Sequence, residues 1–325
     1  MLTLYCWKDK NCVKIPFDTI DPLVSTPEGT FWLDLVNPTI DEESVVERIL
    51  GVEMPSKAEM SEIEASSRLY MEDGALVMTL PVIHQSVSDE PETTSVTFIL
   101  AGEKLLTLRY ADPAPFVLFT QRLRRNPTSI KNGEHALLAL LEQITDRLAD
   151  ILEAAMASLD VYSRETFRAE EALATGLPDY KDSLRRLGRV GTLSGKAKES
   201  LLSLSRLLLF LTAHLEVNKT GMNRIKSLMR DAKSIDEHAT FLSSKVAFLL
   251  DATIGLINIE QNNIIKLFSV AAVIVMPPTL VASIYGMNFR IMPELNWAFG
   301  YPLALVLMVI SAIIPFWWFR RKNWL

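Results

Sequence analysis

The residues that suggest chemistry recur at heptad spacing in a stretch near the end of the chain. Steps of three and four residues from Asp251 select positions that are almost all polar or small. The residues of this polar stripe are Asp251, Gly255, Asn258, Asn262, Ile265, Ser269, Ala272, Met276, Thr279 and Ser283, with Gly286 next. Positions at this spacing share one face of an α-helix, where a dry coiled coil would place Leu and Ile. The stripe therefore predicts a face that meets water or other helices.

Two interpretations of the stripe remain open. Polar groups that face lipid are left unpaired, so small and polar residues in a membrane helix turn toward helix partners or water. Tight helix packing through small residues is one interpretation. The other is an aqueous pore, which also accounts for Asp251, Asn258 and Asn262. One helix cannot surround a pore, so the second interpretation requires a symmetric oligomer.

Two long apolar segments place the part of the stripe from Ile265 to Ser283 in a membrane. Residues 264–284 comprise 21 residues with one charge, Lys266, and residues 298–319 comprise 22 residues with none. About 20 apolar residues in a helix cross a hydrocarbon layer of roughly 30 Å. A buried core helix could explain one such segment, but two in succession predict two transmembrane helices. The loop 285–297 between them is bordered by aromatic residues typical of a membrane interface.

Charge predicts the orientation of these two helices. The second is followed by Arg320, Arg321 and Lys322, whereas the loop carries Arg290 balanced by Glu294. Basic residues favour the cytoplasmic side, so both termini are expected in the cytoplasm. The opening "MLTLYCWKDK" has charges where a signal peptide needs an apolar core, so no signal peptide is predicted.

The rest of the chain is acidic. Residues 264–325 hold five basic and one acidic side chain, so of the total charge of −6, residues 1–263 carry −10. This balance argues against nucleic-acid binding and favours attraction of cations. Cys6 and Cys12, on a predicted pair of N-terminal strands, are expected to be free thiols in a reducing compartment.

The first half of this acidic region predicts an α/β domain. "FWLDLV" (31–36) is typical of a buried strand, and Thr39 with Glu42 predicts a capping box for a helix that ends at Gly51. Segments 68–85 and 95–110 predict hairpins that turn at Asp73-Gly74 and Ala101-Gly102.

From Gly133 onward the pattern is helical. One helix is expected to about Thr175, a second from the Gly176-Leu177-Pro178 break to about Val217, and a third from Met222 into the membrane, a rod on the order of 90 Å. The predicted fold class is α+β. Its parts are an α/β domain (1–132), a helical hairpin (133–221), a stalk helix (222–285, membrane part 264–284), a loop (285–297), a second span (298–319) and a basic tail (320–325).

Short motifs in the last quarter of the chain resemble a known family. "YGMNF" (285–289) followed by "MPEL" (292–295) is similar to the signature of the CorA family of magnesium transport proteins. The likeness extends to "GLINIEQNNIIKLFSV" (255–270), "PPTLVAS" (277–283) and the terminal "RRKNWL". "GMN" also occurs at 221–223 among polar residues, so the specificity lies in the flanking residues and in the position at the end of a membrane span.

The resemblance implies a homopentameric funnel in the bacterial inner membrane, with roles for particular residues. Gly286, Met287 and Asn288 would form the selectivity filter, with a ring of Asn288 amides that holds hydrated Mg²⁺. Ile265 and Phe268 would form an apolar constriction. The rest of the stripe from Asn258 to Ser283 would line the pore, and Met276 and Thr279 match known pore positions of the family. Arg290 departs from the acidic residue often found there.

The resemblance also implies regulation by the transported ion. Asp251 would bind regulatory Mg²⁺ between subunits, and Asp89 and Glu90 are candidate partners in a polar loop. The expected function is gated, passive uptake of Mg²⁺ and Co²⁺, with Ni²⁺ as a further candidate, and closure by cytoplasmic Mg²⁺. The expected partners are further copies of the chain, the phospholipid membrane and divalent cations.

Alternatives come from two other classes. A zinc transporter of the same superfamily is one, although "MPEL" and the terminal "KNWL" favour the magnesium branch. Separately, the four dispersed histidines and the two cysteines show no spacing typical of a zinc site. A membrane-anchored sensor that does not conduct is the other, but an anchor does not need a polar stripe. No phosphate-binding loop or nucleophile elbow is present, so neither an enzyme nor a catalytic cofactor is expected.

Overall fold

The computed structural model divides into two compact units, Met1–Leu250 and Asp251–Leu325. Helix α6 (Lys219–Tyr285) contributes residues to both. The structure describes residues 1–8, 11–16, 27–62, 64–125, 130–168, 180–215, 218–287, 292–293, 297, 299–322 and 324.

A seven-stranded sheet organises the first unit. Its strand order is β2-β1-β3-β7-β6-β5-β4, and only β3 and β7 pair in parallel. The strands are β1 (Leu2–Lys8), β2 (Asn11–Pro16), β3 (Thr30–Val36), β4 (Leu69–Glu72), β5 (Ala75–His84), β6 (Glu92–Ala101) and β7 (Lys104–Arg109). The long strands are apolar on both faces, as expected for a sheet that is covered on both sides.

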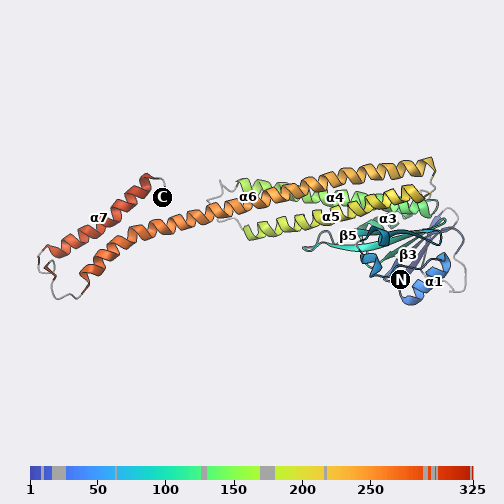
Figure 1. Cartoon of the computed structure of the whole chain (residues 1–325), viewed down its shortest axis with the longest axis horizontal. Coiled ribbons are helices and arrows are strands. Elements are labelled where there is room, and N and C mark those ends of the chain that lie inside the picture. The colour runs from blue at the N-terminus through green and yellow to red at the C-terminus, as the bar shows by residue number, and fades with distance from the viewer. Residues whose placement is uncertain are drawn as a thin grey trace. The chain divides into compact units, whose positions relative to one another are not determined.

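Helices cover the two faces of the sheet unequally. Helices α3 (Ala114–Arg125), α4 (Gly133–Arg168) and α5 (Tyr180–His214) lie on one face, and α1 (Ile40–Leu50) lies on the other (Figure 1). Successive residues of β3 contribute to opposite cores, because strand side chains alternate. Trp32 packs in the larger core with Phe119, whereas Leu33 packs in the smaller core with Val46 of α1. Two short helices, η2 (Glu59–Ser61) and α2 (Ala65–Arg68), precede β4.

Local signals in the sequence are confirmed in this unit. Thr39 and Glu42 form the predicted capping box, and Gly51 ends α1 in the left-handed conformation at φ 71°. The first hairpin turns at Asp73 and Gly74, both with positive φ, which a tight two-residue turn requires. The second hairpin pairs Ala101 with Lys104, so its turn is Gly102-Glu103, one residue later than predicted. Only Gly102 has the positive φ there, 57°, and this fixes the register.

The long helices occupy the predicted stretches with small differences at their ends. Helix α4 is described to Arg168, and the Gly176-Leu177-Pro178 break lies outside the described residues. Helix α5 ends at His214, and α6 begins at Lys219, three residues before Met222. The second "GMN" triplet, at 221–223, is therefore part of the first turns of α6. The ion pair between Arg224 and Glu142 (2.8 Å) joins α6 to α4 in the first unit.

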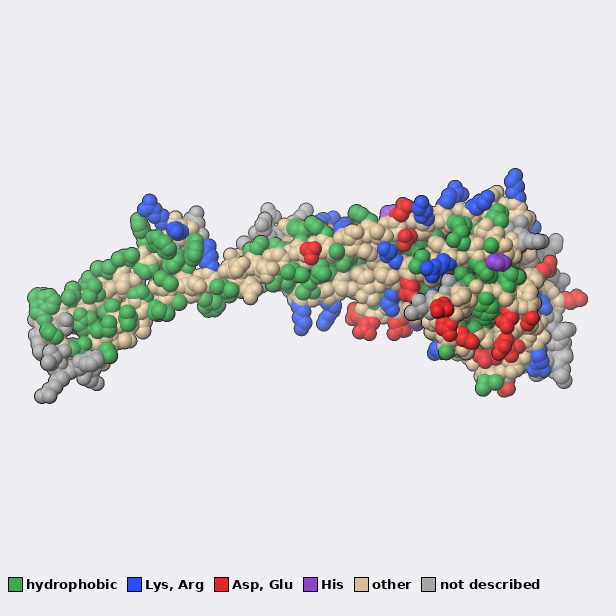
Figure 2. All heavy atoms as spheres, viewed as in Figure 1, with side chains coloured by type: hydrophobic (Ala, Val, Ile, Leu, Met, Phe, Trp, Pro, Cys, Tyr) green, Lys and Arg blue, Asp and Glu red, His purple; other side chains and the backbone are tan. Residues whose placement is uncertain are grey.

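The second unit consists of the remainder of α6 and helix α7 (Gly300–Arg321). Among the described helices, these two are long and apolar enough to cross a membrane. In their most apolar windows only 6% and 11% of the residues are buried, unlike the core helix of a soluble protein. The charge contrast between the units is visible in Figure 2. Acidic side chains gather near α1 in the first unit, whereas basic side chains gather at the end of α7 in the second.

Gly133, at the start of α4, allows a close approach to the β6–β7 turn. A Cβ there would collide with the backbone nitrogen of Leu105 and lie 2.6 Å from the carbonyl carbon of Lys104. We expect Gly133→Ala to lower the free energy of unfolding by about 1–3 kcal/mol, because backbone must move. Thermal unfolding followed by circular dichroism measures the change.

Gly188→Ala in α5 is the matched control. A Cβ at Gly188 meets nothing within 4 Å, and alanine favours helix by up to about 1 kcal/mol. A melting temperature of Gly133→Ala equal to or above that of the parent chain would contradict the packing described here.

Candidate functional site

The polar stripe lies along α6 in the second unit and ends where the helix ends. All its residues from Asn258 to Ser283 are exposed in the single chain. The two largest apolar members, Met276 and Ile265, are 67% and 55% exposed. A continuous face of this length, polar at most steps, is therefore available to water or to further copies of the chain.

The buried side chain of α6 in the second unit's apolar stretch lies on a different face from the stripe. Val270 of α6 and Ala304 and Phe319 of α7 are the buried apolar side chains among the described residues of this unit. At 3.6 residues per turn, Val270 lies roughly 125° around the helix from the centre of the stripe. The stripe is thus left uncovered by the chain's own second helix.

Two hydroxyl groups on the stripe are oriented by their own helix. Ser269 donates to the carbonyl of Ile265 and Thr279 to that of Val275, both at 2.8 Å. This back-bonding uses the hydroxyl hydrogen, so the oxygen keeps its lone pairs for an outside donor or cation. Ser269 and Thr279 can therefore offer acceptor oxygens without exposing unpaired donors.

Pro277 and Pro278 interrupt the hydrogen-bond ladder of α6 between Met276 and Thr279. Proline has no N–H, so the carbonyls four residues earlier, at Val273 and Ile274, lose their usual partners. Non-bonded carbonyls at membrane depth are tolerated where they are buried in protein or border water. The carbonyls of Val273 and Ile274 therefore favour contact with protein or water rather than lipid.

The proposed filter follows directly on the last turn of α6. Gly286 donates to the carbonyl of Ala282 at 2.9 Å, and Met287 to that of Ile284 at 3.2 Å. A Cβ on Gly286 would lie 3.1 Å from the Ala282 oxygen, which is tighter than ordinary contact. The predicted residues Asn288, Arg290 and Glu294 lie outside the described residues. Gly286 and Met287, the first two residues of the predicted filter, thus lie at a helix end, where carbonyl groups are unpaired.

The predicted constriction residues are exposed side by side on α6. Phe268 is 71% exposed and Ile265 is 55% exposed, one turn apart on the same side of the helix. Exposed aromatic and aliphatic side chains on the edge of a polar stripe are consistent with an apolar ring formed by several copies.

The predicted regulatory residues lie in different units. Asp251 is exposed at the start of the second unit, and Asp89 and Glu90 are exposed in the turn between β5 and β6 of the first. No group of three His, Cys, Asp or Glu side chains that could hold a metal occurs in the described part of the chain. A site shared between subunits would leave only part of its ligands on each chain.

The sequence reasoning missed an aromatic–cation cluster near the end of α7. The Lys266 ammonium lies 5.3 Å from the ring centre of Trp324, which stacks on Phe319 at 5.5 Å. In the predicted basic tail, the Lys322 ammonium lies 4.7 Å from the Trp318 ring and the Arg321 guanidinium 5.6 Å from the Trp317 ring. The alternation of Trp with Arg and Lys in "FWWFRRKNWL" was the available signal.

Solved structures share this architecture. The complete CorA magnesium transporter from Methanocaldococcus jannaschii aligns with a TM-score of 0.74 and 19% identity, over 100% of this chain and 99% of that one. The full-length CmaX protein gives a TM-score of 0.70 at 16% identity, over 100% and 98%. The cytoplasmic domain of ZntB from Vibrio parahaemolyticus gives 0.53 at 12% identity, over 79% of this chain and 97% of that domain. At these identities the likeness concerns the fold alone.

Sequence relatives extend the likeness beyond the fold. The magnesium transport protein CorA of Escherichia coli K12 is 34% identical over 325 residues, which cover 100% of both chains. The protein of that name from Yersinia pseudotuberculosis has the same identity and coverage. The model of the CorA-like Mg²⁺ transporter proteins matches residues 27–321. The expectation from the YGMNF and MPEL motifs is confirmed: the chain belongs to the CorA family.

Proposed function

We propose that this protein is a gated, passive transporter that admits Mg²⁺, and also Co²⁺, through a pore lined by α6 of several copies. The observation that carries the proposal is the uncovered polar stripe on α6, which leads to Gly286 and Met287 at the helix end. The names of the 34% identical relatives support Mg²⁺ as the cargo.

The copies form a symmetric ring, which we propose to be a homopentamer. One α6 per subunit presents its stripe to the axis, while α7 and the apolar remainder of α6 face lipid. The chain lies in the bacterial inner membrane with both termini in the cytoplasm. The basic tail after α7 and its aromatic–cation pairs favour this orientation.

Selectivity begins with a hydrated ion. Mg²⁺ gives up its water shell reluctantly, so a ring of Asn288 amides serves it better by hydrogen-bonding the bound waters than by displacing them. Neutral amides also hold a divalent cation more weakly than carboxylates, and conduction requires release. The membrane potential drives entry, worth about 2.3 kcal/mol per charge per 100 mV and roughly twice that for a divalent ion.

The proposed filter generates the main test. We expect Asn288→Ala or Gly286→Ala to reduce Mg²⁺ uptake into liposomes to background, a loss of tenfold or more, with the oligomer intact. The amide ring is lost in the first variant, and the second forces a side chain against the Ala282 carbonyl. Flux of Mg²⁺, Co²⁺, Ni²⁺ and Zn²⁺, with and without a pH gradient, measures both rate and preference.

Asn223→Ala is the control, since Asn223 belongs to the second GMN triplet, in the first turns of α6. It should transport at the parental rate. Parental uptake by both filter variants would show that the filter lies elsewhere, and a preference for Zn²⁺ would favour the zinc-transporter alternative.

A second test concerns the constriction. A narrow apolar ring excludes water and so blocks ions. We expect Ile265→Ser or Phe268→Ser to raise the flux of the closed state about tenfold, measured at high internal Mg²⁺. The same change at Leu267, on the opposite side of α6 and 60% exposed, should not raise it. Equal closed-state flux in all three variants and the parent would place the gate outside this ring.

The proposed regulation rests on charge. Residues 1–263 carry −10 in each copy, so neighbouring copies repel one another unless cations bind between them. Mg²⁺ bound at sites that include Asp251 relieves this repulsion and favours the closed ring. Binding shifts the equilibrium only because the closed state has the higher affinity. Asp251 lies about 20 Å along α6 from Ile265, so one helix connects the proposed regulatory site with the proposed constriction.

We expect Asp251→Lys to stabilise the closed ring without metal, because a fixed ammonium replaces the bound cation. Protease resistance in EDTA should rise, and uptake should fall. Asp251→Ala should instead keep the pore open at higher internal Mg²⁺ than the parent. Limited proteolysis and flux across a series of Mg²⁺ concentrations measure both effects. If neither variant changes either dependence on Mg²⁺, Asp251 is only a solvated helix residue.

A further inference from the structure

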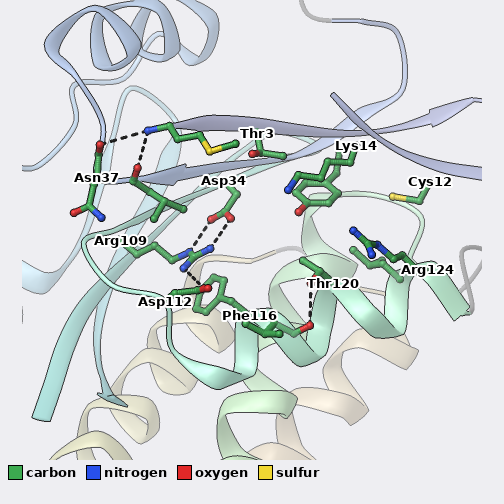
Figure 3. A pocket seen from close by; sticks show the side chains of 15 residues that line it. Thr3, Cys12, Lys14, Asp34, Asn37, Arg109, Asp112, Phe116, Thr120 and Arg124 are labelled. Atoms are coloured by element: carbon green, nitrogen blue, oxygen red, sulfur yellow. Dashed lines mark hydrogen bonds and ion pairs between the residues drawn. The ribbon is translucent and has the colours of Figure 1, made fainter. Parts of the chain in front are cut away.

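A cavity of about 580 Å³ lies in the first unit, between the sheet and α3. Its volume is in the range of pockets that take up small organic molecules. Strands β1, β2 and β3, the end of β7 and helix α3 all contribute to its walls (Figure 3). Nothing in the proposed transport of ions uses this cavity.

The position of the cavity in the topology favours a ligand. Strands β3 and β7 are adjacent and parallel, so their carboxyl ends meet at one edge of the sheet. The chain leaves β3 toward α1 on one face and leaves β7 toward α3 on the other. Such a switch point opens a crevice at the carboxyl ends of the strands, and open α/β sheets commonly bind ligands there. The cavity includes Asn37, which directly follows β3 and adopts φ 44°.

One end of the cavity holds a buried ion-pair network. Arg109 donates to both oxygens of Asp34, at 3.0 and 2.9 Å, and to Asp112 at 2.6 Å. The side chains of Arg109 and Asp34 are 7% and 6% exposed, whereas that of Asp112 is 61% exposed. Burial alone would lower the pKa of Arg109, but its bonds to Asp34 and Asp112 raise it. Asp112 keeps a carboxylate oxygen that can accept from a hydroxyl group.

The other end of the cavity is cationic. Lys14 reaches in from β2 and Arg124 from α3, on opposite walls (Figure 3). Both side chains are exposed and form no ion pair with the described residues. Tyr5 lies close enough to Asp34 and Arg124 to be influenced by both, and burial raises its pKa so that the hydroxyl stays a donor. The cavity thus has two uncompensated cations at one end and an acceptor at the other.

We propose that this cavity binds a small hydroxylated phosphate ester, the chemistry shared by sugar phosphates and nucleotides. The phosphate lies between Lys14 and Arg124, where two cations can form charge-assisted hydrogen bonds with its oxygens. Hydroxyl groups of the ligand reach Asp112 at the opposite end. Strands β1 and β2, which form one wall of the cavity and carry Lys14, lie before residue 27, where the region matched by the family model begins.

Ribose 5-phosphate is the probe, because it carries the phosphate and the hydroxyls alone. Titration calorimetry on the full-length protein in detergent, at fixed Mg²⁺, should show saturable binding. Lys14→Gln/Arg124→Gln should weaken the affinity tenfold or more, since charge-assisted bonds are lost. Arg125→Gln, an exposed neighbour on α3 outside the cavity, should leave it within about twofold. Inorganic phosphate and ribose should each bind at least tenfold more weakly than the ester.

Three results would overturn the proposal. These are no binding of ribose 5-phosphate at millimolar concentration, equal affinity of the double variant and the parent, or affinity no higher than that of inorganic phosphate. The single variants, each expected to lose affinity, replace the double variant if its melting temperature falls. Binding is measured without ion flux, so failure here leaves the transport proposal untouched.

Discussion

A hydrocarbon layer offers no hydrogen-bonding partners, and this constraint decides how the second unit is built. Most polar groups of α6 within the apolar stretch are satisfied by the helix itself, including the hydroxyls of Ser269 and Thr279. What remains is a face that is too polar for lipid and that α7 does not cover. The carbonyls of Val273 and Ile274, which lose their usual partners at Pro277 and Pro278, also need hydrogen-bond partners. In a membrane, a single copy would leave these groups without hydrogen-bond partners, and the proposed association through α6 would supply them.

The first unit meets a different constraint, since its sheet is apolar on both faces. Two separate cores result, one beneath α1 and one beneath the long helices. Several polar groups within the sheet are paired across strands. The Trp32 indole donates to Thr107 at 3.0 Å, and the hydroxyls of Thr79 and Thr97 lie 2.8 Å apart. Such fully satisfied pairs specify strand register as well as stability.

The sequence alone predicted those features whose signal is local or periodic. The Thr39 capping box and the Asp73-Gly74 turn depend on residues within a few positions of one another, and the polar stripe repeats over ten positions of one helix. The pairing of Asp34 with Arg109 joins residues 75 positions apart and follows only from the parallel alignment of β3 and β7, which no local pattern specifies. The contact of Lys266 with Trp324 likewise depends on how α6 and α7 pack. The proposed regulatory site would take its ligands from several chains, so the sequence of one chain cannot specify how Asp251, Asp89 and Glu90 combine.

The distribution of the tryptophans along the chain affects the intrinsic fluorescence of the protein. Four of the six lie in the second unit, at positions 297, 317, 318 and 324, and each is about half exposed or more in the single chain. In a membrane these rings are solvated by lipid and headgroups rather than by water. Trp32, in contrast, is fully buried and stacks on Tyr5 with ring centres 4.2 Å apart. Intrinsic fluorescence of this protein will therefore report mainly on the bilayer around α7, and brominated lipids should quench most of it while the signal from Trp32 persists.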